Sequence, residues 1–427
     1  MMSLSKTNPI IRDRGVCDPH IHIFKDRAYL YASHDASPSS TDYVMNDWQV
    51  WSSDDLVNWV HESTLRPEDT YMGPSQRCWA VDAAERNGKY YLYFSNGMTD
   101  TGVAVADHPG GPFRDALGKP LLAADLTPTR SYDPSVFIDD DDDQSAYIIF
   151  GTPVWAGGDS YYIARLGDDM ISLAEKPEKI ILDDGADDKP FLHKFGGLYY
   201  LSWASFYAVS ESVYGPYRMQ GNIGASPDHG SFFSWRGQWF HAFTIFDPTP
   251  HHRASGICYV HYHADGRMVV DPVIVEHGVG HYDAGLNRID ATWFMESAHV
   301  CKHANPRYGF DISPTESDAY LCFPSVHDLP DSPAISFFAA YAPVETETHG
   351  VIEVRDAGPD GKLLGTCTVS DTRSLHWRGY RSWTTGELLL TGNTRSADLC
   401  LAFRDFEPGR LRLSFFRVAP AHHCPPV

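Results

Sequence analysis

The sequence lacks the features that mark membrane proteins, zinc proteins and disulfide-rich proteins. Its 427 residues include 8 cysteines, which are scattered with no CxxC pair and no zinc-finger spacing. No stretch is long and apolar enough to span a bilayer. The opening MMSLSKTNPIIRDR has no apolar core of the kind that a signal peptide needs. From these absences we expect a reduced, cytoplasmic protein.

Positive charge is also scarce. Lys plus Arg number 34 and Asp plus Glu number 56, so the formal net charge is −22. This sign disfavours nucleic acids, anionic membranes and polyanionic substrates as partners, and it favours a neutral ligand. The oligomeric state is not indicated by the sequence.

Helix signals are weak, and turns rich in Gly, Pro, Asn and Asp separate short strand-like segments. A turn followed by alternating aromatic and aliphatic residues occurs five times: KDRAYLYAS (25–33), NGKYYLYFS (87–95), QSAYIIFG (144–151), GGLYYLSWA (196–204) and RGQWFHAF (236–243). Repeats of about 40 to 50 residues built from strands are typical of propeller blades. We therefore predict a five-bladed β-propeller over residues 1–288.

The pattern changes from about Ile289 onward. Short strand-like segments with alternating residues follow, among them YLCFPSV (320–326), AISFFAAYA (334–342) and RLRLSFFRV (410–418). Their spacing predicts a β-sandwich of the jelly-roll kind over residues 289–427. The protein is thus expected to be all-β, with two domains.

Three of the predicted inner strands open on an aspartate, namely Asp18, Asp133 and Asp188. In a propeller such residues converge at one end of the axis, where they repel one another and are costly to desolvate, so we expect a function for them. Glycoside hydrolysis uses one carboxylate as base and one carboxylic acid as proton donor. A third acidic group nearby keeps the donor protonated. A single Asp-Pro is more often a simple turn, but three at equivalent places favour catalysis.

The same residues carry a family resemblance. Asp18-Pro19 after NPIIRDRGVC, then VWSSDDLVNW, Cys78-Trp79-Ala80 before RNGKYYLYFS, DPSVFID from Asp133, and PFLHKFGGLYYLSW follow in this order. Over residues 8–285 the chain resembles glycoside hydrolase family 43, a family of five-bladed propellers that are inverting glycosidases. The resemblance implies that Asp18 is the general base, that Asp133 tunes and orients the acid, and that Asp188 is the acid.

The acid is where the sequence departs from the family pattern. The family has Glu-Gly-Pro ahead of the strand, and this chain has Asp188-Lys189-Pro190. Lys189 favours the ionised form of its neighbour, which is the wrong state for a proton donor. Asp187 and Glu211 are the alternative donors.

Four residues are predicted to contact substrate: Trp79, Trp203, His229 and Arg253. Flat aromatic rings bind the C–H faces of sugars well, and Trp79 is a better candidate than Trp203 or Trp155. His229 resembles the axial histidine of the family, which helps to hold a calcium ion or a water cluster. The alternative is that His229 is a hydrogen-bonded core residue. Arg253 resembles a family arginine that reaches the pocket, and its alternative is a surface ion pair.

The C-terminal region resembles carbohydrate-binding module family 6 through GVIEVRDAGPDGKLLGTCTV, DLCLAF and RLSFFRV. Trp377 and Tyr380 are candidates for the aromatic pair that clamps a sugar. The domain either binds sugar or only supports the propeller.

These observations predict an exo-acting, inverting glycosidase that releases a terminal α-L-arabinofuranose or β-xylose from oligosaccharides. No organic cofactor is implied, and a structural calcium ion on the axis, with His229 as ligand, stays open. The alternatives are a galactofuranosidase or other galactosidase, a propeller phosphorylase that uses the cations around Arg253, and a non-catalytic sugar-binding protein.

Overall fold

The computed structural model describes residues 6–12, 15–152, 158–183, 186–225, 228–344, 348–390 and 395–421. The chain divides into two compact units. One comprises Asn8–Phe233 and Trp239–Gly278, and the other comprises Met1–Thr7, Ser234–Gln238 and Val279–Val427. The predicted domain boundary at 288/289 remains a prediction. Among the described residues, no helix has the length and apolar character needed to cross a membrane.

The first unit contains five antiparallel sheets of four strands each. The first two sheets are formed by β1 (Gly15–Phe24), β2 (Arg27–Asp35), β3 (Met45–Ser53), β4 (Val60–Leu65), β5 (Val81–Arg86), β6 (Lys89–Ser95), β7 (Thr101–Ala106) and β8 (Arg114–Asp115). The next two are formed by β9 (Ser135–Ile138), β10 (Ala146–Thr152), β11 (Ser160–Arg165), β12 (Glu178–Lys179), β13 (Phe191–Phe195), β14 (Leu198–Trp203), β15 (Phe206–Ser210) and β16 (Arg218–Asn222). The fifth is formed by β17 (Gly230–Trp235), β18 (Gln238–Thr249), β19 (His252–Tyr262) and β20 (Met268–Val270). Short helices span Pro67–Asp69 and Pro272–His277 (α1).

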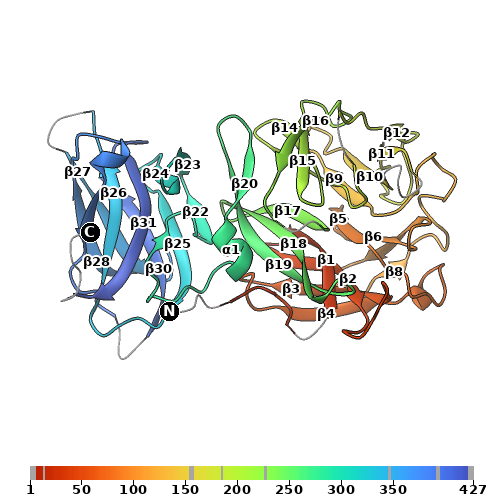
Figure 1. Ribbon diagram of the computed structural model, residues 1–427, viewed down its shortest axis with the longest axis horizontal. Helices are drawn as coiled ribbons and strands as arrows, with labels where there is room; N and C mark the ends of the chain where they lie inside the picture. The colour runs from red at the N-terminus through yellow and green to blue at the C-terminus, as the bar shows by residue number, and fades with distance from the viewer. Residues whose placement is uncertain are drawn as a thin grey trace. The chain divides into compact units, whose positions relative to one another are not determined.

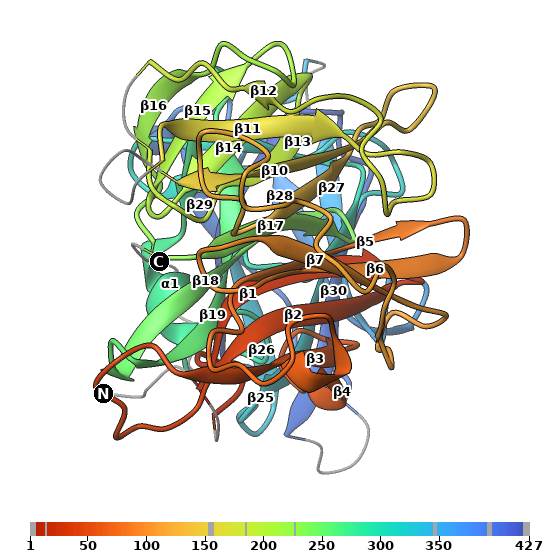
Figure 2. The same ribbon diagram turned by 90° about the vertical axis from the view of Figure 1, so that its right-hand side faces the viewer.

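These sheets are the blades of a propeller, which confirms the predicted fold class. In Figure 2 the colours pass from red through orange and yellow to green around a common centre. The repeated aromatic segments form the second strand of each blade, β2, β6, β10, β14 and β18. Their side chains alternate between the two faces of a blade, so neighbouring blades share cores. For example, Tyr31 and Trp48 of the first blade pack in one cluster with Leu92 of the second blade.

The innermost strands β1, β5, β9, β13 and β17 surround the axis and are tied together by hydrogen bonds. The backbone N–H of Val136 donates to Asp82 over 2.6 Å, and that of Ile21 donates to the Ser231 hydroxyl over 3.0 Å. The N–H of Ile10 donates to the carbonyl of Ser255 in β19 over 2.9 Å. The beginning of the chain therefore pairs with the last blade, and the ring is closed.

The second unit is a β-sandwich of two sheets, most of whose strands are labelled in Figure 1. One sheet contains β21 (Ile289–Asp290), β23 (Val300–Asn305), β24 (Gly309–Pro314), β26 (Pro333–Tyr341), β29 (Arg381–Thr384) and β31 (Leu411–Pro420). The other contains β22 (Glu296–Ala298), β25 (Tyr320–His327), β27 (His349–Asp356), β28 (Lys362–Ser370) and β30 (Ser396–Arg404). Phe323 of the second sheet meets Phe416 of the first, edge to face, with ring centroids 5.0 Å apart. Both rings are fully buried, so they mark the core between the sheets.

Two cysteines of the sandwich face each other across neighbouring strands. Cys322 of β25 pairs with Cys400 of β30 in the sheet register, and the two form a disulfide. Structural disulfides persist mainly in oxidising compartments. The expectation of a fully reduced chain is therefore wrong at this pair, and the cytoplasmic location stays a prediction.

Candidate active site

Three residues, one within β1 and two just ahead of β9 and β13, adopt a backbone conformation that residues with a side chain rarely take. Asp18, Asp133 and Lys189 have φ values of 53°, 52° and 65°, and each precedes a proline. The left-handed region costs a residue other than glycine about 1–2 kcal/mol, and such strain collects at functional sites. By backbone geometry, the third member of the set is Lys189, and Asp188 lies one residue earlier.

Asp18 is a buried carboxylate that Arg253 holds with two hydrogen bonds. Arg253 Nη1 lies 2.8 Å from Oδ1 and Nη2 lies 3.4 Å from Oδ2. The backbone N–H of Asp18 donates to the Thr244 hydroxyl over 3.1 Å. Burial by itself would raise the pKa of Asp18, but Arg253, and after it His229, lower it to about 2. Asp18 is therefore ionised in the folded protein at neutral pH.

Arg253 is itself fully engaged by carboxylates. Its Nε and Nη2 each lie 3.1 Å from an oxygen of Asp35, and Nη1 lies 2.9 Å from Asp228 Oδ2. The guanidinium also stacks over the Tyr43 ring at 5.1 Å. The alternative of a surface ion pair is wrong, because the side chain is buried. Its predicted contact with substrate remains a prediction.

Asp133 accepts two backbone hydrogen bonds and faces His229. Its Oδ1 accepts from the N–H of Ala80 over 3.3 Å, and its Oδ2 accepts from the N–H of Lys189 over 3.1 Å. His229 bridges the aspartates, with Nδ1 3.3 Å from Asp18 and Nε2 3.5 Å from Asp133. Burial raises the pKa of Asp133, and His229 only partly offsets this effect. Burial would lower the pKa of His229, but Asp18 and Asp133 raise it well above its usual value.

Asp188 forms a direct ion pair with the ammonium of the next residue, Lys189. Its other oxygen accepts from the Tyr132 hydroxyl over 3.1 Å. Burial opposes ionisation of Asp188, but Lys189 outweighs it and the pKa of Asp188 is lowered. Asp187 lies on the other side of the ammonium, 3.2 Å from Lys189 Nζ. Its pKa is raised by burial, which Lys189 only partly offsets.

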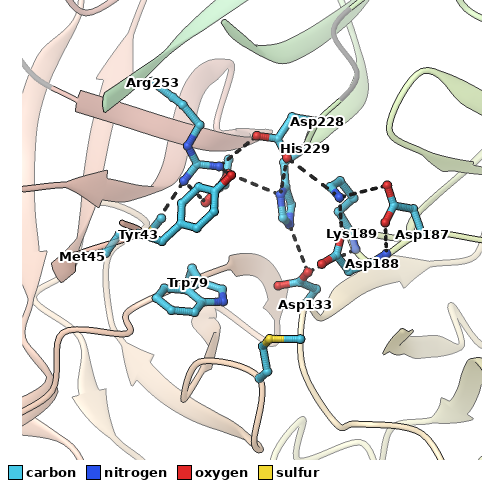
Figure 3. A pocket seen from close by; sticks show the side chains of 12 residues that line it. Tyr43, Met45, Trp79, Asp133, Asp187, Asp188, Lys189, Asp228, His229 and Arg253 are labelled. Carbon is cyan, nitrogen blue, oxygen red and sulfur yellow. Dashed lines mark hydrogen bonds and ion pairs between the residues drawn. The ribbon is translucent and has the colours of Figure 1, made fainter. Parts of the chain in front are cut away.

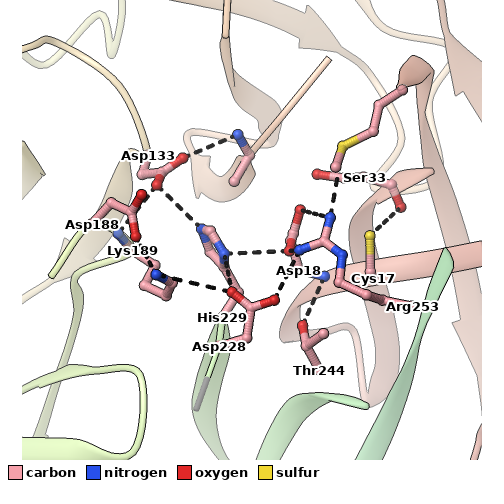
Figure 4. Close-up of polar contacts among 12 residues, drawn as sticks. Cys17, Asp18, Ser33, Asp133, Asp188, Lys189, Asp228, His229, Thr244 and Arg253 are labelled. Carbon is pink, nitrogen blue, oxygen red and sulfur yellow. Dashed lines mark hydrogen bonds and ion pairs between the residues drawn. The ribbon is translucent and has the colours of Figure 1, made fainter. Parts of the chain in front are cut away.

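Asp228 joins the two ends of the site, as Figure 4 shows. Its Oδ2 accepts from Arg253, while its Oδ1 lies 3.5 Å from His229 Nδ1 and 4.0 Å from Lys189 Nζ. Burial raises its pKa, but His229, Arg253 and Lys189 together lower it far below its usual value. One buried carboxylate therefore touches all three cations of the site.

These residues converge on a cavity of about 350 Å³. Figure 3 shows Asp133, Asp187, Asp188 and Asp228 on one side of it and Trp79 and Tyr43 on the other. Its lining comprises Asp18, Tyr43, Met45, Trp79, Met98, Asp133, Asp187, Asp188, Lys189, Asp228, His229 and Arg253. The lining thus combines charged groups with aromatic and thioether surface. Such a surface suits a ring that has hydroxyl groups on its edge and C–H groups on its face.

Comparison with known proteins agrees with this geometry. The family described as "Glycosyl hydrolases family 43" matches residues 6–207. A protein of Humicola insolens named xylosidase/arabinosidase 43A is 30% identical over 62% of this chain and 98% of its own. The chain belongs to glycosyl hydrolase family 43.

Two further relatives extend the comparison. A protein of Bacteroides ovatus named xylosidase/arabinosidase is 29% identical over 60% of this chain and 94% of its own. The solved structure of a family 43 arabinoxylan arabinofuranohydrolase from Bacillus subtilis, in complex with cellotetraose, covers 97% of this chain and 98% of its own, with a TM-score of 0.55 and 22% identity. That likeness shows the fold over both units. The protein is a glycosidase, its substrate is a carbohydrate, and the family needs no organic cofactor.

The aromatic residues predicted to contact substrate differ in position. Trp79 lines the cavity of the glycosidase and is partly buried. Trp203 is only 3% exposed and packs with Tyr161 and Leu192 in the core shared by the third and fourth blades. The predicted substrate contact of Trp203 is therefore wrong, because strand β14 turns that side chain between blades. Trp155 lies outside the described residues.

The two alternative proton donors, Asp187 and Glu211, lie in different places. Asp187 lines the cavity, while Glu211 is exposed in the turn after β15. Glu211 is therefore a surface residue and is not part of the cavity lining. Asp35 and Asp228 were missed as site residues. Asp228 stands beside His229 at a strand opening, which is a usable signal, but Asp35 comes near Arg253 only through the closure of the ring.

The structural calcium ion that the sequence left open does not fit these residues. The ligand atoms of Asp18, Asp228 and His229 lie within 4.8 Å of one another, but calcium takes six to eight oxygen ligands. Both carboxylates already accept hydrogen bonds from Arg253. A guanidinium at this distance repels a divalent cation, so no step of the reaction is assigned to calcium.

Proposed function

We propose that this family 43 enzyme is an exo-acting, inverting glycosidase that removes a terminal α-L-arabinofuranosyl or β-xylosyl residue from oligosaccharides. The two relatives named xylosidase/arabinosidase support this substrate class. The observation that carries the proposal is the cavity of about 350 Å³ with three family-type carboxylates in its lining. Ligand cavities range over about 300–1,000 Å³, so this one suits one or two sugar rings better than a long polymer.

Asp18 is the general base in this proposal. A base must be ionised before the water attacks, and Arg253 keeps Asp18 ionised. The guanidinium also fixes the direction of the carboxylate, because a bidentate contact sets geometry as well as charge. The water that Asp18 activates attacks the anomeric carbon from the face opposite the leaving group, which inverts the configuration.

Asp188 is the proton donor in this proposal, and Asp133 is the third carboxylate that faces the donor. A negative charge near Asp188 favours its protonated form, whereas the ammonium of Lys189 favours its ionised form. Asp187 is the second candidate, because its pKa is raised and it lines the same cavity. The proton passes from the donor to the glycosidic oxygen as the bond to the anomeric carbon breaks.

The test is a panel of nitrophenyl glycosides, comprising α-L-arabinofuranoside, β-D-xyloside, β-D-galactofuranoside and β-D-galactoside. Cleavage of one of the first two is expected, and proton NMR during the reaction should show the inverted anomer first. Appearance of the retained anomer would contradict the assignment of Asp18 as base. Exclusive cleavage of a galactofuranoside or galactoside would change the assigned substrate. A protein that binds sugars but cleaves none of them would be a non-catalytic binding protein.

For the second unit we propose a carbohydrate-binding module similar to family 6. Trp377 supports this role, because it is 38% exposed and lies beside the guanidinium groups of Arg307 and Arg378. Tyr380 is only 6% exposed and donates its hydroxyl to Asp311, so it is not available as a second platform. Retention of the protein on insoluble xylan should fall on Trp377→Ala while hydrolysis of small substrates is unchanged.

A cytoplasmic location also remains a proposal, which fractionation of cells would test.

A further inference from the structure

Arginine side chains and aromatic rings alternate along one surface of the second unit. The guanidinium of Arg378 lies 5.0 Å from the centre of the Trp377 ring, and that of Arg307 lies 5.1 Å from the same ring. Arg307 also lies 5.5 Å from the centre of the Tyr308 ring. These four residues, Arg307, Tyr308, Trp377 and Arg378, form what is called here the arginine–aromatic surface.

The outer part of this surface is open to solvent, and its inner part is anchored. Trp377 is 38% exposed, and Arg307 and Arg378 are exposed as well. The Tyr308 ring packs on that of Phe415, with ring centroids 6.1 Å apart. A ligand that approaches Trp377 therefore meets a flat aromatic ring and two guanidinium groups at once.

Both loops that carry the surface are held by hydrogen bonds of their own. The Asn305 side chain accepts from the backbone N–H groups of Arg307 and Tyr308 over 3.0 and 3.2 Å. The guanidinium of Arg381 donates to the backbone carbonyl of Arg378 over 2.9 Å. A backbone that is ordered in advance loses less entropy when a ligand binds, so the surface is prepared for binding.

The two arginines of this surface differ from other arginines of the second unit in their partners. Arg355 and Arg404 each pair with Glu353, at 2.9 and 3.2 Å, and Arg395 pairs with Asp331 at 3.2 Å. Within the described part of the chain, no carboxylate forms an ion pair with either arginine of the arginine–aromatic surface. The chain has 56 acidic residues against 34 Lys and Arg, so this unpaired positive charge is a local exception.

The side chains of the surface suit a ligand that combines apolar ring faces with negative charge. Aromatic rings pack well on the C–H faces of sugars. The planar guanidinium group matches the two oxygens of a carboxylate or a phosphate. The net charge of −22 disfavours densely charged polymers such as nucleic acids. A glycan that carries carboxylates at intervals meets all of these conditions.

We propose that the arginine–aromatic surface binds an acidic glycan, namely a polysaccharide that carries uronic acid residues. A sugar ring packs on Trp377, and a uronate carboxylate accepts hydrogen bonds from Arg307 or Arg378. The inference rests on the proposed carbohydrate-binding role of the second unit and names the class of its ligand. It thus separates the ligand of this unit from the neutral sugar that the propeller cleaves.

The experiment measures binding of the full chain by affinity electrophoresis in gels that contain a soluble glucuronoxylan. A second gel contains the same polymer after its carboxyl groups have been reduced to alcohols. The wild type should bind the acidic polymer about fivefold or more tightly than the reduced one. This preference should shrink as salt is added, because exposed charges are screened.

The variants divide the surface into its charged and its aromatic parts. Arg307→Gln and Arg378→Gln should each lose most of the preference for the acidic polymer and keep the affinity for the reduced one. Arg307→Lys, which keeps the charge without the planar fork, should lie between Arg307→Gln and the wild type. Trp377→Ala should weaken binding to both polymers. A melting curve for each variant shows that the chain is folded.

Arg395→Gln is the matched control, because Arg395 is an exposed arginine of the same unit that is already paired with Asp331. It should bind both polymers as the wild type does. Equal binding of the two polymers by the wild type would overturn the inference and leave the carbohydrate-binding role in place. Binding to neither polymer would remove that role as well, while cleavage of nitrophenyl glycosides would still test the propeller. Binding of poly-glutamate as tight as that of the acidic polymer would indicate a site for acidic proteins and would also overturn the inference.

Discussion

The two ends of the pocket hold their carboxylates with different cations. At the base end, Arg253 contacts Asp18, Asp35 and Asp228 through a planar, permanently charged group. At the acid end, Lys189 serves Asp187, Asp188 and Asp228 with a compact ammonium on a flexible chain. Guanidinium groups fix direction as well as charge, whereas an ammonium acts as a point charge. The base is therefore held in one geometry and one charge state, and the acid end shares its charge among several groups.

The largest effect is expected at the base. Asp18→Asn removes the group that activates water, so kcat should fall by about 10²- to 10⁴-fold. The loss should be similar for good and poor leaving groups, because water attack is impaired in both. Asp139→Asn, a change at a carboxylate outside the cavity that pairs with Lys194, should leave kcat unchanged. Full activity of Asp18→Asn would remove Asp18 from the mechanism.

The acid end should respond to the leaving group instead. Asp188→Asn should reduce the rate by about 10²-fold or more on xylo- or arabino-oligosaccharides, which need protonation. Dinitrophenyl glycosides need little protonation and should lose much less. The measurement is kcat across a series of leaving groups for Asp188→Asn and Asp187→Asn. The donor is the residue whose variant shows the steeper dependence, so a steeper slope for Asp187→Asn would transfer the role to Asp187.

The effect of Arg253 on Asp18 can be tested by the pH dependence of activity and stability. Arg253 lowers the pKa of Asp18 to about 2 against the effect of burial, so weakening this contact must raise that pKa. Arg253→Lys should move the acid limb of kcat/KM to higher pH by about one unit. The stability from the lowered pKa is present above the pKa of the unfolded state and is lost as pH falls through the folded value. The variant should therefore also unfold at a higher pH during acid titration.

Smaller effects on catalysis are expected for the two tryptophans, of which Trp79 lines the cavity and Trp203 lies in the core. Trp79→Ala should raise KM about fivefold with little change in melting temperature, because a lost stacking contact is worth about 1 kcal/mol. Trp203→Ala should leave KM unchanged but lower the free energy of unfolding by about 3–5 kcal/mol, because it opens a cavity between blades. Kinetics and denaturant titration on the same samples check both. A changed KM for Trp203→Ala would contradict its assignment to the core.

Much of the fold and of the carboxylate set was predictable, because both follow from local patterns. The aromatic repeats place the second strand of every blade, since alternation with period two decides which side chains enter the core. The aspartates ahead of Pro19 and Pro134 lie in or next to two inner strands, and the axis of a propeller brings such residues together. Trp203 was misassigned because local alternation does not say which face of a blade meets the cavity.

The sequence by itself determined the blades, the sandwich and the presence of Asp18, Asp133 and Asp188 near one axis. Only the tertiary structure decided the partners of those residues. Arg253 meets Asp35 from a position 218 residues away, and Asp228 joins both ends of the pocket. The physical reason is that ring closure sets these distances, and no spacing along the chain encodes them. The charge state of each carboxylate depends on such distances, so it could not be predicted from the sequence alone.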